Sequence, residues 1–218
     1  MLPFHQRLAR VGLAAIAEYG FVLAGGYAIS ANGIGDRPSD DVDLFTDVPS
    51  PERFAEAAAR LRGALGADGL EVVDLRVRPT FVNLLVSDPV SRSSSELQLG
   101  LDYRGFPPAQ LDVGPTLDLR DAVGGKLSAL WSRGEARDFI DIDAVLEYGR
   151  FTRSQLLTIA DQVEASPLDR GMLAQRFRGA GHHAEQIYAR YSVDAARRRA
   201  IIGRFADWAD EIDSSRRP

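Results

Sequence analysis

The chain has 218 residues, of which 45% are hydrophobic and 26% charged, a composition that is ordinary for a globular protein of one large or two small domains. The absence of cysteine excludes disulfide scaffolds and thiolate zinc sites. The net charge of −5 argues against a general nucleic-acid binder. The charge is uneven, because residues 150–218 hold 12 Arg against 9 Asp plus Glu, a net of +3 that leaves −8 on residues 1–149.

This asymmetry fits an enzyme with an acidic, metal-binding half and a basic half that acts on a nucleotide or nucleic acid. Ordinary scatter of surface charge explains it equally well. The start of the chain lacks the apolar core of a signal peptide, and no apolar run approaches the length of a membrane span. We therefore expect a cytoplasmic protein that does not associate with membranes.

The first half of the chain mixes helix and strand signals. Ser50 and Pro51 are typical of the N-cap and first position of a helix, and the segment 96–103 alternates leucines with polar residues as a half-buried strand does. The predicted elements, in chain order, are a helix at 5–19, a strand at 21–24, a helix at 26–32, a strand at 41–46, a helix at 51–65, and strands at 71–77, 80–86 and 96–103.

A proline-containing linker is predicted at 105–115, and from there on the pattern is helical. The predicted helices are 119–132, 136–148, 152–164, 167–178 and 193–212. We therefore predict an α+β protein of two domains, with a mixed sheet and flanking helices in residues 1–115 and a helical domain in residues 116–218.

Asp41-Val42-Asp43-Leu44 alternates acidic and apolar residues, so on a strand both carboxylates lie on one face. Neighbouring carboxylates repel each other unless a cation binds between them or one is protonated. Oxygen ligands of this kind suit Mg²⁺ or Mn²⁺, and Mg²⁺ shares its other positions with water and substrate phosphate. Asp102, at the end of another predicted strand, is a candidate third ligand. Alternatively, Asp41 and Asp43 lie on a solvent-facing strand without a metal, and Asp102 is an ordinary aspartate at the end of a strand.

Gly25 and Gly26 form a corner between an apolar strand and a short helix. Backbone N–H groups at such a corner suit a phosphate. With the paired carboxylates that follow, this corner predicts a nucleoside triphosphate site.

Lys126 is the single lysine among 26 basic residues. Its ammonium is a compact point charge, which a guanidinium fork does not replace where a narrow site binds one phosphate oxygen. On the next predicted helix, Arg137 and Asp141 are four residues apart and Asp138 and Asp141 three apart, so they lie along one edge. A helix pair joined by a surface salt bridge is the alternative, but the single lysine favours a functional cluster.

Two further groups carry weaker signals. His182 and His183 have no partner carboxylate at ligand spacing, so they are a poor zinc candidate. The segment 197–199, three arginines, is a candidate for nucleic-acid binding together with Tyr191 and Trp208. A solvated helix face is the better explanation of these arginines.

Together, these motifs resemble those of the AbiEii/MenT-type nucleotidyltransferase toxins, which belong to the DNA polymerase beta-like nucleotidyltransferase superfamily. The resemblance spans about residues 20–150 and rests on Gly25-Gly26, the segment 37–45 (Arg-Pro-Ser-Asp-Asp-Val-Asp-Leu-Phe), Lys126-Leu-Ser-Ala-Leu and Arg137-Asp-Phe-Ile-Asp141. This chain departs from the family where Tyr27 follows two glycines, because many relatives have Gly-Ser at that corner.

The resemblance implies a two-lobed, metal-dependent nucleotidyltransferase that acts on tRNA 3′ ends and blocks translation until an antitoxin encoded beside it neutralises it. Carried over by position, the catalytic residues are Asp41, Asp43, Lys126 and Asp141, the nucleotide-binding residues are Gly25, Gly26, Ser39 and Lys126, and the metal ligands are Asp41 and Asp43. A small-molecule nucleotidyltransferase acting on an aminoglycoside-like hydroxyl, and an inactive module that binds a nucleotide or partner, are the alternatives.

Overall fold

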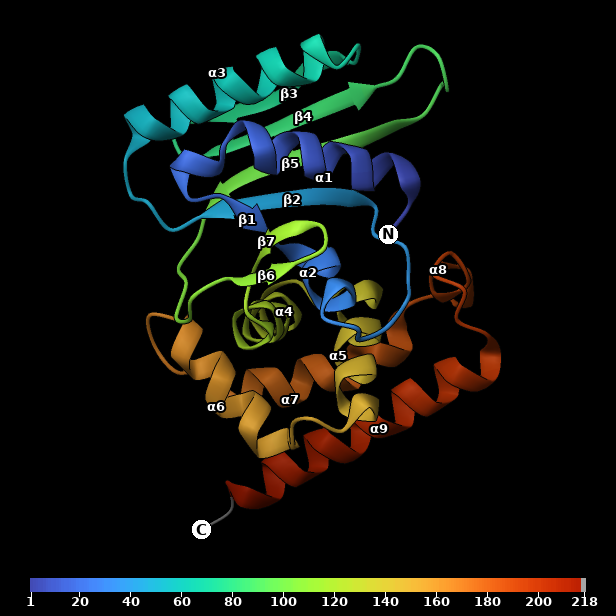
Figure 1. The fold of residues 1–218 in the computed structure, drawn as a ribbon. Coiled ribbons are helices and arrows are strands. Elements are labelled where there is room, and N and C mark those ends of the chain that lie inside the picture. The colour runs from blue at the N-terminus through green and yellow to red at the C-terminus, as the bar shows by residue number, and fades with distance from the viewer. Residues whose placement is uncertain (217–218) are drawn as a thin grey trace. The chain divides into compact units, whose positions relative to one another are not determined.

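A computed structural model describes residues 1–216 of the chain, which divide into two compact units, one of residues 1–119 and one from residue 120 onward (Figure 1). The first unit contains a mixed seven-stranded sheet with helices, and the second is helical. This confirms the predicted α+β fold class.

The sheet of the first unit has the strand order β3-β4-β5-β2-β1-β7-β6. The strands β2 and β5 are parallel, as are β1 and β7, and the other neighbours are antiparallel. The bounds are β1 Val22–Leu23, β2 Asp41–Thr46, β3 Glu71–Arg78, β4 Phe81–Ser87, β5 Ser94–Leu101, β6 Ala109–Leu111 and β7 Gly114–Thr116. The helices are α1 Pro3–Ala15, α2 Gly25–Ala31 and α3 Pro51–Ala67.

One face of this sheet forms the hydrophobic core with α1 and α3. Val42 and Leu44 of β2 are fully buried there, beside Leu97 and Leu99 of β5, and the two helices supply the facing apolar side chains. The alternate residues of β2 are only partly buried. The period of two therefore places Asp41 and Asp43 on the face opposite this core.

Two sequence expectations for this unit were wrong in detail. The predicted linker at 105–115 holds β6 and β7, and β7 extends the sheet beside β1 through the pairing of Leu23 with Thr116. Strands of three residues are too short to show a periodic pattern. The helix predicted at 5–19 ends at Ala15, and a 3₁₀ turn at Ala17–Tyr19 follows it and ends at Gly20, which adopts a left-handed conformation.

The second unit contains α4 Leu119–Ser132, α5 Ala136–Tyr148, α6 Arg153–Val163, α7 Arg170–Arg178, α8 Glu185–Ala189 and α9 Ala195–Ser215. No sequence pattern indicates the short α8, which has only five residues. Aromatic side chains build the core: the ring centroids of Phe139 and Phe205 are 4.9 Å apart, and those of Phe177 and Trp208 are 4.6 Å apart. Among the helices that the structure describes, none has the length and apolarity needed to cross a membrane.

Candidate active site

The corner at Gly25 lies directly against the Asp43 carboxylate. Gly25 has φ +60°, and a Cβ at this position would lie 1.8 Å from Asp43 Oδ2. The Ala24 N–H also donates to the Asp43 carbonyl oxygen at 2.9 Å, which continues the pairing of β1 with β2. Only glycine fits here, because any side chain would displace the carboxylate and strain the backbone.

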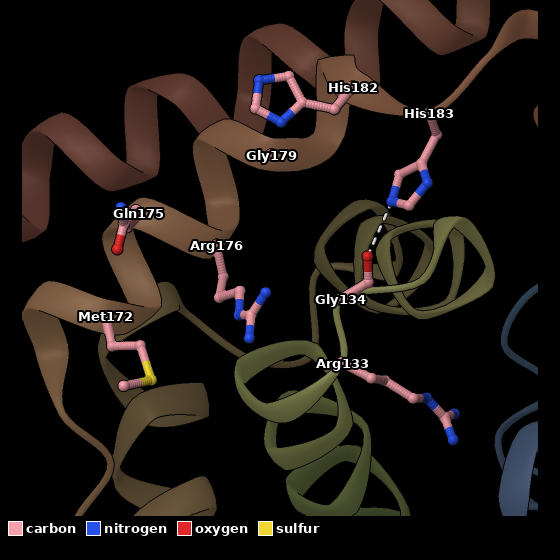
Figure 2. Close-up of a pocket in the computed structure, with 8 residues that line it drawn as sticks. All are labelled: Arg133, Gly134, Met172, Gln175, Arg176, Gly179, His182 and His183. Carbon is pink, nitrogen blue, oxygen red and sulfur yellow. Dashed lines mark hydrogen bonds between the residues drawn. The ribbon is translucent and has the colours of Figure 1, made fainter.

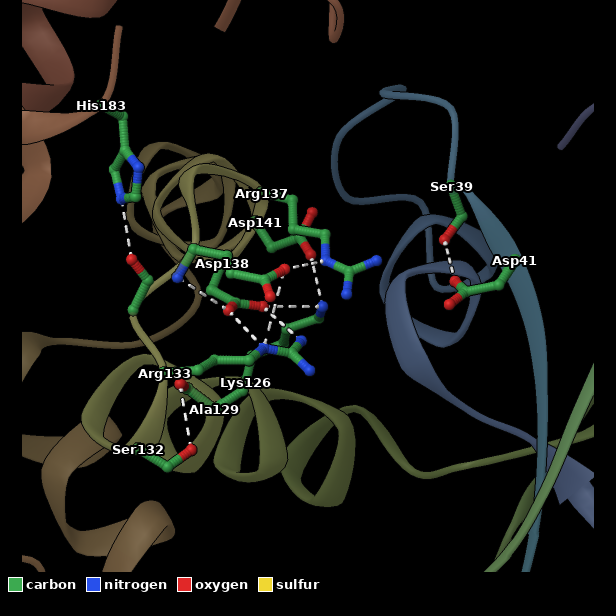
Figure 3. Close-up of polar contacts among 12 residues, drawn as sticks. Ser39, Asp41, Lys126, Ala129, Ser132, Arg133, Arg137, Asp138, Asp141 and His183 are labelled. Atoms are coloured by element: carbon green, nitrogen blue, oxygen red, sulfur yellow. Dashed lines mark hydrogen bonds and ion pairs between the residues drawn. The ribbon is translucent and has the colours of Figure 1, made fainter. Parts of the chain in front are cut away.

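Gly26, Arg37 and Ser39 converge next to this contact. A Cβ on Gly26 would lie 2.9 Å from a terminal nitrogen of Arg37 and 3.2 Å from Ser39 Oγ. The Ser39 hydroxyl donates to Asp41 Oδ1 at 3.3 Å (Figure 3). The first unit thus brings together all five of its residues predicted for nucleotide or catalytic roles, namely Gly25, Gly26, Ser39, Asp41 and Asp43, and adds the cation Arg37.

Asp102 is not brought to the paired carboxylates. The parallel register places Glu96 beside Asp41 and Gln98 beside Asp43, and Gln98 Nε2 donates to Asp41 Oδ2 at 3.2 Å. Asp102 lies four residues beyond Gln98, which is about 13 Å along a strand. There its N–H donates to Thr46 O at 2.9 Å, at the far end of β2. Glu96 is therefore the acidic residue that the strand register places beside Asp41, and its Oε2 accepts a hydrogen bond from Asn83 Nδ2 at 2.7 Å.

The donor set fits a cation that shares its coordination with a substrate. No group of three or more His, Cys, Asp or Glu side chains with metal-binding geometry occurs within residues 1–216. Two carboxylates on one strand face match Mg²⁺, which commonly takes one or two protein carboxylates and completes its shell with phosphate oxygens and water.

Tyr27, where the corner departs from many relatives, is a buried hydrogen-bonding centre. Its hydroxyl lies 2.6 Å from His5 Nδ1, accepts from the Leu2 N–H at 3.4 Å and is also hydrogen bonded by the backbone of Ser39. Burial lowers the pKa of His5, although the negative charge of Asp41 acts in the opposite sense. The pair ties α1 to the loop that carries Ser39.

In the second unit, Lys126 of α4 is buried between two carboxylates of α5 (Figure 3). Its Nζ lies 3.2 Å from Asp138 Oδ1 and 3.0 Å from Asp141 Oδ2. Arg133 binds the same Asp138 carboxylate, with 3.0 Å from Nε to Oδ2 and 3.0 Å from a terminal nitrogen to Oδ1. Lys126 and Asp141 are thus in direct contact, and Asp138 is the residue through which Arg133 joins the cluster.

Electrostatics favour the ionised form of Asp138. Burial raises the pKa of Asp138, but the hydrogen bond from Arg133 and the charges of Lys126 and Arg133 outweigh it, so the pKa lies below its usual value. A carboxylate that stays ionised without exposure to water holds the lysine ammonium in place.

Two arginines of α9 contribute to the packing of that helix against α5. Arg197 and Arg204 of α9 both form ion pairs with Asp143, which is fully buried on α5, and the distance from Arg204 to Asp143 Oδ1 is 2.8 Å. Trp208 is also fully buried. The Trp208 ring therefore has no exposed face on which a base could stack, and Arg197 is engaged in helix packing rather than lying on the freely solvated face that we favoured for these arginines.

A pocket of about 520 Å³ in the second unit is lined by Arg133, Gly134, Met172, Gln175, Arg176, Gly179, His182 and His183 (Figure 2). Two of its basic side chains hold the end of α4 and the turn that follows it. Arg176 donates to Trp131 O at 3.0 Å and Ser132 O at 2.9 Å, at the end of α4, and a His183 ring nitrogen lies 2.8 Å from Gly134 O. Arg176 and His183 therefore stabilise the α4–α5 turn.

Comparison with known proteins decides the family. The model of the nucleotidyl transferase AbiEii toxin family, of type IV toxin–antitoxin systems, matches residues 8–216. The chain belongs to the AbiEii family. No match to it was found among curated proteins.

Solved structures similar to this AbiEii protein support the fold. MenT4, a nucleotidyltransferase toxin from Mycobacterium tuberculosis, aligns with a TM-score of 0.65 and 17% identity over 97% of this chain and 85% of its own. A candidate nucleotidyltransferase from H. pylori aligns with a TM-score of 0.59 and 15% identity over 97% and 94%. JHP933 from Helicobacter pylori aligns with a TM-score of 0.53 and 16% identity over 97% and 91%.

Sequence reasoning missed three residues around the corner formed by Gly25 and Gly26. Arg37 begins the motif at residues 37–45, so its position four residues before Asp41 could have been used as a signal. Glu96 has the alternating neighbours of a strand residue, but only the parallel register selects it over Asp102. The contact of His5 with Tyr27 joins residues 22 positions apart and leaves no local pattern.

Proposed function

We propose that this AbiEii protein transfers a nucleotidyl group from a nucleoside triphosphate to a terminal hydroxyl of RNA, with the tRNA 3′ end as acceptor. The observation that carries the proposal is the contact of Gly25 with Asp43, because it joins a glycine corner suited to phosphate to a pair of acidic residues. In the reaction, the acceptor oxygen bonds to the α-phosphorus, the bond from that phosphorus to the bridging oxygen breaks, and pyrophosphate leaves. The hydroxyl proton passes to solvent or to a nearby base.

In the first unit, Asp41 and Asp43 would hold Mg²⁺ or Mn²⁺. Bound there, the ion would supply positive charge against the charge that develops on the leaving pyrophosphate. The N–H groups of Gly25 and Gly26 and the Ser39 hydroxyl contact the triphosphate, and Arg37 adds a cation beside them. These groups orient the phosphate chain, and positioning provides much of the rate in phosphoryl-type transfer.

In the second unit, Lys126 contacts the triphosphate as a point charge. Asp138 and Asp141 position it, since each carboxylate lies within hydrogen-bonding distance of the ammonium. A long, flexible lysine held on two sides has fewer rotamers to lose when the nucleotide binds. We assign Asp141 this positioning role, and a role as base for the acceptor hydroxyl is the alternative.

Membership of a type IV toxin–antitoxin family implies an antitoxin partner for this chain. We propose that the product, a tRNA whose 3′ end is blocked, stops translation, and that the antitoxin prevents or reverses this. The expected site of action is the cytoplasm, where charged tRNA is used.

The test is transfer of label from each of the four α-labelled nucleoside triphosphates, with Mg²⁺ and total tRNA. Labelled tRNA supports the proposal, label only on an added aminoglycoside supports a small-molecule enzyme, and no label supports an inactive binding module. Asp41→Ala should retain the circular dichroism spectrum and lose at least ~90% of transfer, a loss of more than about 1.4 kcal/mol in transition-state stabilisation. A folded Asp41→Ala protein that keeps more than a tenth of the activity would contradict the assignment.

A further inference from the structure

The sheet face that carries Asp41 and Asp43 extends well beyond the two carboxylates. Alternate positions on β2, β5 and β4 are buried in the core, and most of the positions between them are partly exposed. We name the second set the carboxylate face. It comprises Asp41, Asp43 and Phe45 of β2, Glu96, Gln98 and Gly100 of β5, and Phe81, Asn83 and Leu85 of β4.

One row across the carboxylate face is polar and ends in a cation. Asp43 pairs with Gln98, Gln98 with Asn83, and Asn83 with Arg76 of the edge strand β3. Arg76 is exposed and has no ion-pair partner within the described residues. The row therefore runs from an acidic end, through two amide side chains, to a cation that is available to bind an anion.

The next row is aromatic. Phe45 pairs with Gly100, and Gly100 with Phe81. A Cβ on Gly100 would lie 3.0 Å from two atoms of the Phe45 ring, so the glycine allows that ring to lie close against the strand. Phe45 and Phe81 are both partly exposed. Aromatic side chains on the open face of a sheet are a general means of stacking unpaired RNA bases.

We propose that the carboxylate face binds the single-stranded 3′ end of the RNA acceptor, with bases stacked on Phe45 and Phe81 and a backbone phosphate on Arg76. This inference rests on the proposed function, because it names the surface that holds that acceptor. Charge sets the direction: a 3′ terminus ends in hydroxyl groups, which fit beside Asp41 and Asp43, while the phosphates upstream approach Arg76. A strand placed in the opposite direction would bring a 5′ phosphate against the carboxylates.

Strand spacing gives the length of the bound segment. From β2 to β3 there are three steps of about 4.8 Å, or ~14 Å. A stacked strand rises ~3.4 Å per nucleotide, so the segment is about four nucleotides long. Arg76 should therefore matter for acceptors with at least four unpaired nucleotides and be irrelevant for a dinucleotide.

The first arm measures binding alone, by fluorescence anisotropy of the full-length protein with a 5′-labelled RNA hairpin that has a four-nucleotide 3′ overhang. We expect Arg76→Gln to weaken binding about tenfold and to reduce the salt slope by ~0.7, and Phe81→Leu to weaken it about tenfold. Arg10→Gln is the matched control. Arg10 is an exposed arginine of α1 without an ion-pair partner in the described chain, and this variant should bind like the wild type.

The second arm measures transfer to acceptors with overhangs of one to six nucleotides. The wild type should gain efficiency up to about four nucleotides, and Arg76→Gln should abolish that gain while matching the wild type on the shortest overhang. The proposal is overturned if Arg76→Gln binds and transfers like Arg10→Gln, or if the wild type binds blunt and overhanging hairpins equally. Overhang binding that depends on Arg76, without any transfer to RNA, supports this surface and overturns only the proposed acceptor reaction.

Discussion

The contact between Gly25 and Asp43 makes a sharp prediction for Gly25→Ala. A non-glycine residue at φ +60° costs about 1–2 kcal/mol in backbone energy. The added Cβ would start 1.8 Å from Asp43 Oδ2, and a tolerable contact is at least 3.0 Å, so the carboxylate must move by more than ~1 Å. A displacement of that size at a reacting centre lowers the rate about a hundredfold. We therefore expect both a loss of stability and a loss of nucleotidyl transfer.

Gly69→Ala is the matched control. Gly69 has φ +78°, and no atom lies within 4 Å of the Cβ it would gain. This variant should lose a similar ~1–2 kcal/mol in a urea unfolding curve and keep its transfer activity within about twofold. Transfer of labelled nucleotide, measured at a temperature where all three proteins are folded, compares the two variants. Equal activities of Gly25→Ala and Gly69→Ala would refute the view that Gly25 is required by the position of Asp43.

Three further predictions follow from the same geometry. Glu96→Gln should lower transfer more than ~tenfold because Glu96 is paired with Asp41, whereas Asp102→Asn, just beyond the end of β5, should leave it nearly unaffected; the reverse order of activities would favour Asp102 as a third ligand. Lys126→Arg should lower transfer more than ~tenfold because a guanidinium fork does not replace a compact ammonium that contacts one phosphate oxygen. Arg133→Lys should lower it less, because lysine keeps the positive charge beside Asp138 and loses only one of two hydrogen bonds, and equal effects would argue for a purely structural cluster. Burial raises the pKa of Asp143 to about 6, so the folded state binds this proton more tightly than the unfolded state, and the unfolding free energy falls as the pH rises from about 4 to 6. The loss reaches about 3 kcal/mol by pH 7. In melting curves at pH 4.5 and 7.5, Asp143→Asn should lose less stability than the wild type over this range.

The short-range features of the site follow from the sequence. Alternation along Asp41-Val42-Asp43-Leu44 determines that both carboxylates leave the same strand face, since neighbouring residues on a strand point to opposite sides. The helices at 119–132 and 136–148 match α4 and α5, because each spans more than three turns of periodic apolar residues. The rarity of lysine made Lys126 a candidate site residue without any structural information.

The direction in which β2 pairs with β5 could not be predicted from the sequence. An antiparallel pairing of β2 with β5 would have brought the end of β5, and hence Asp102, to Asp41, and the alternation of Leu97 and Leu99 would have looked the same. The parallel register instead selects Glu96. A strand's own residues carry no record of its partner's direction, which depends on the connections and packing of the whole sheet.

Burial of single side chains was likewise decided by tertiary contacts. Trp208 and the arginines of α9 have the composition of a nucleic-acid surface, yet the helix turns the ring into the core and pairs Arg197 and Arg204 with Asp143. Composition and spacing, then, determined which chemical groups the protein carries and which face of its own element each occupies. Contacts between residues far apart in the chain decided which groups meet, because the energy of burial and ion pairing exists only after those elements have packed.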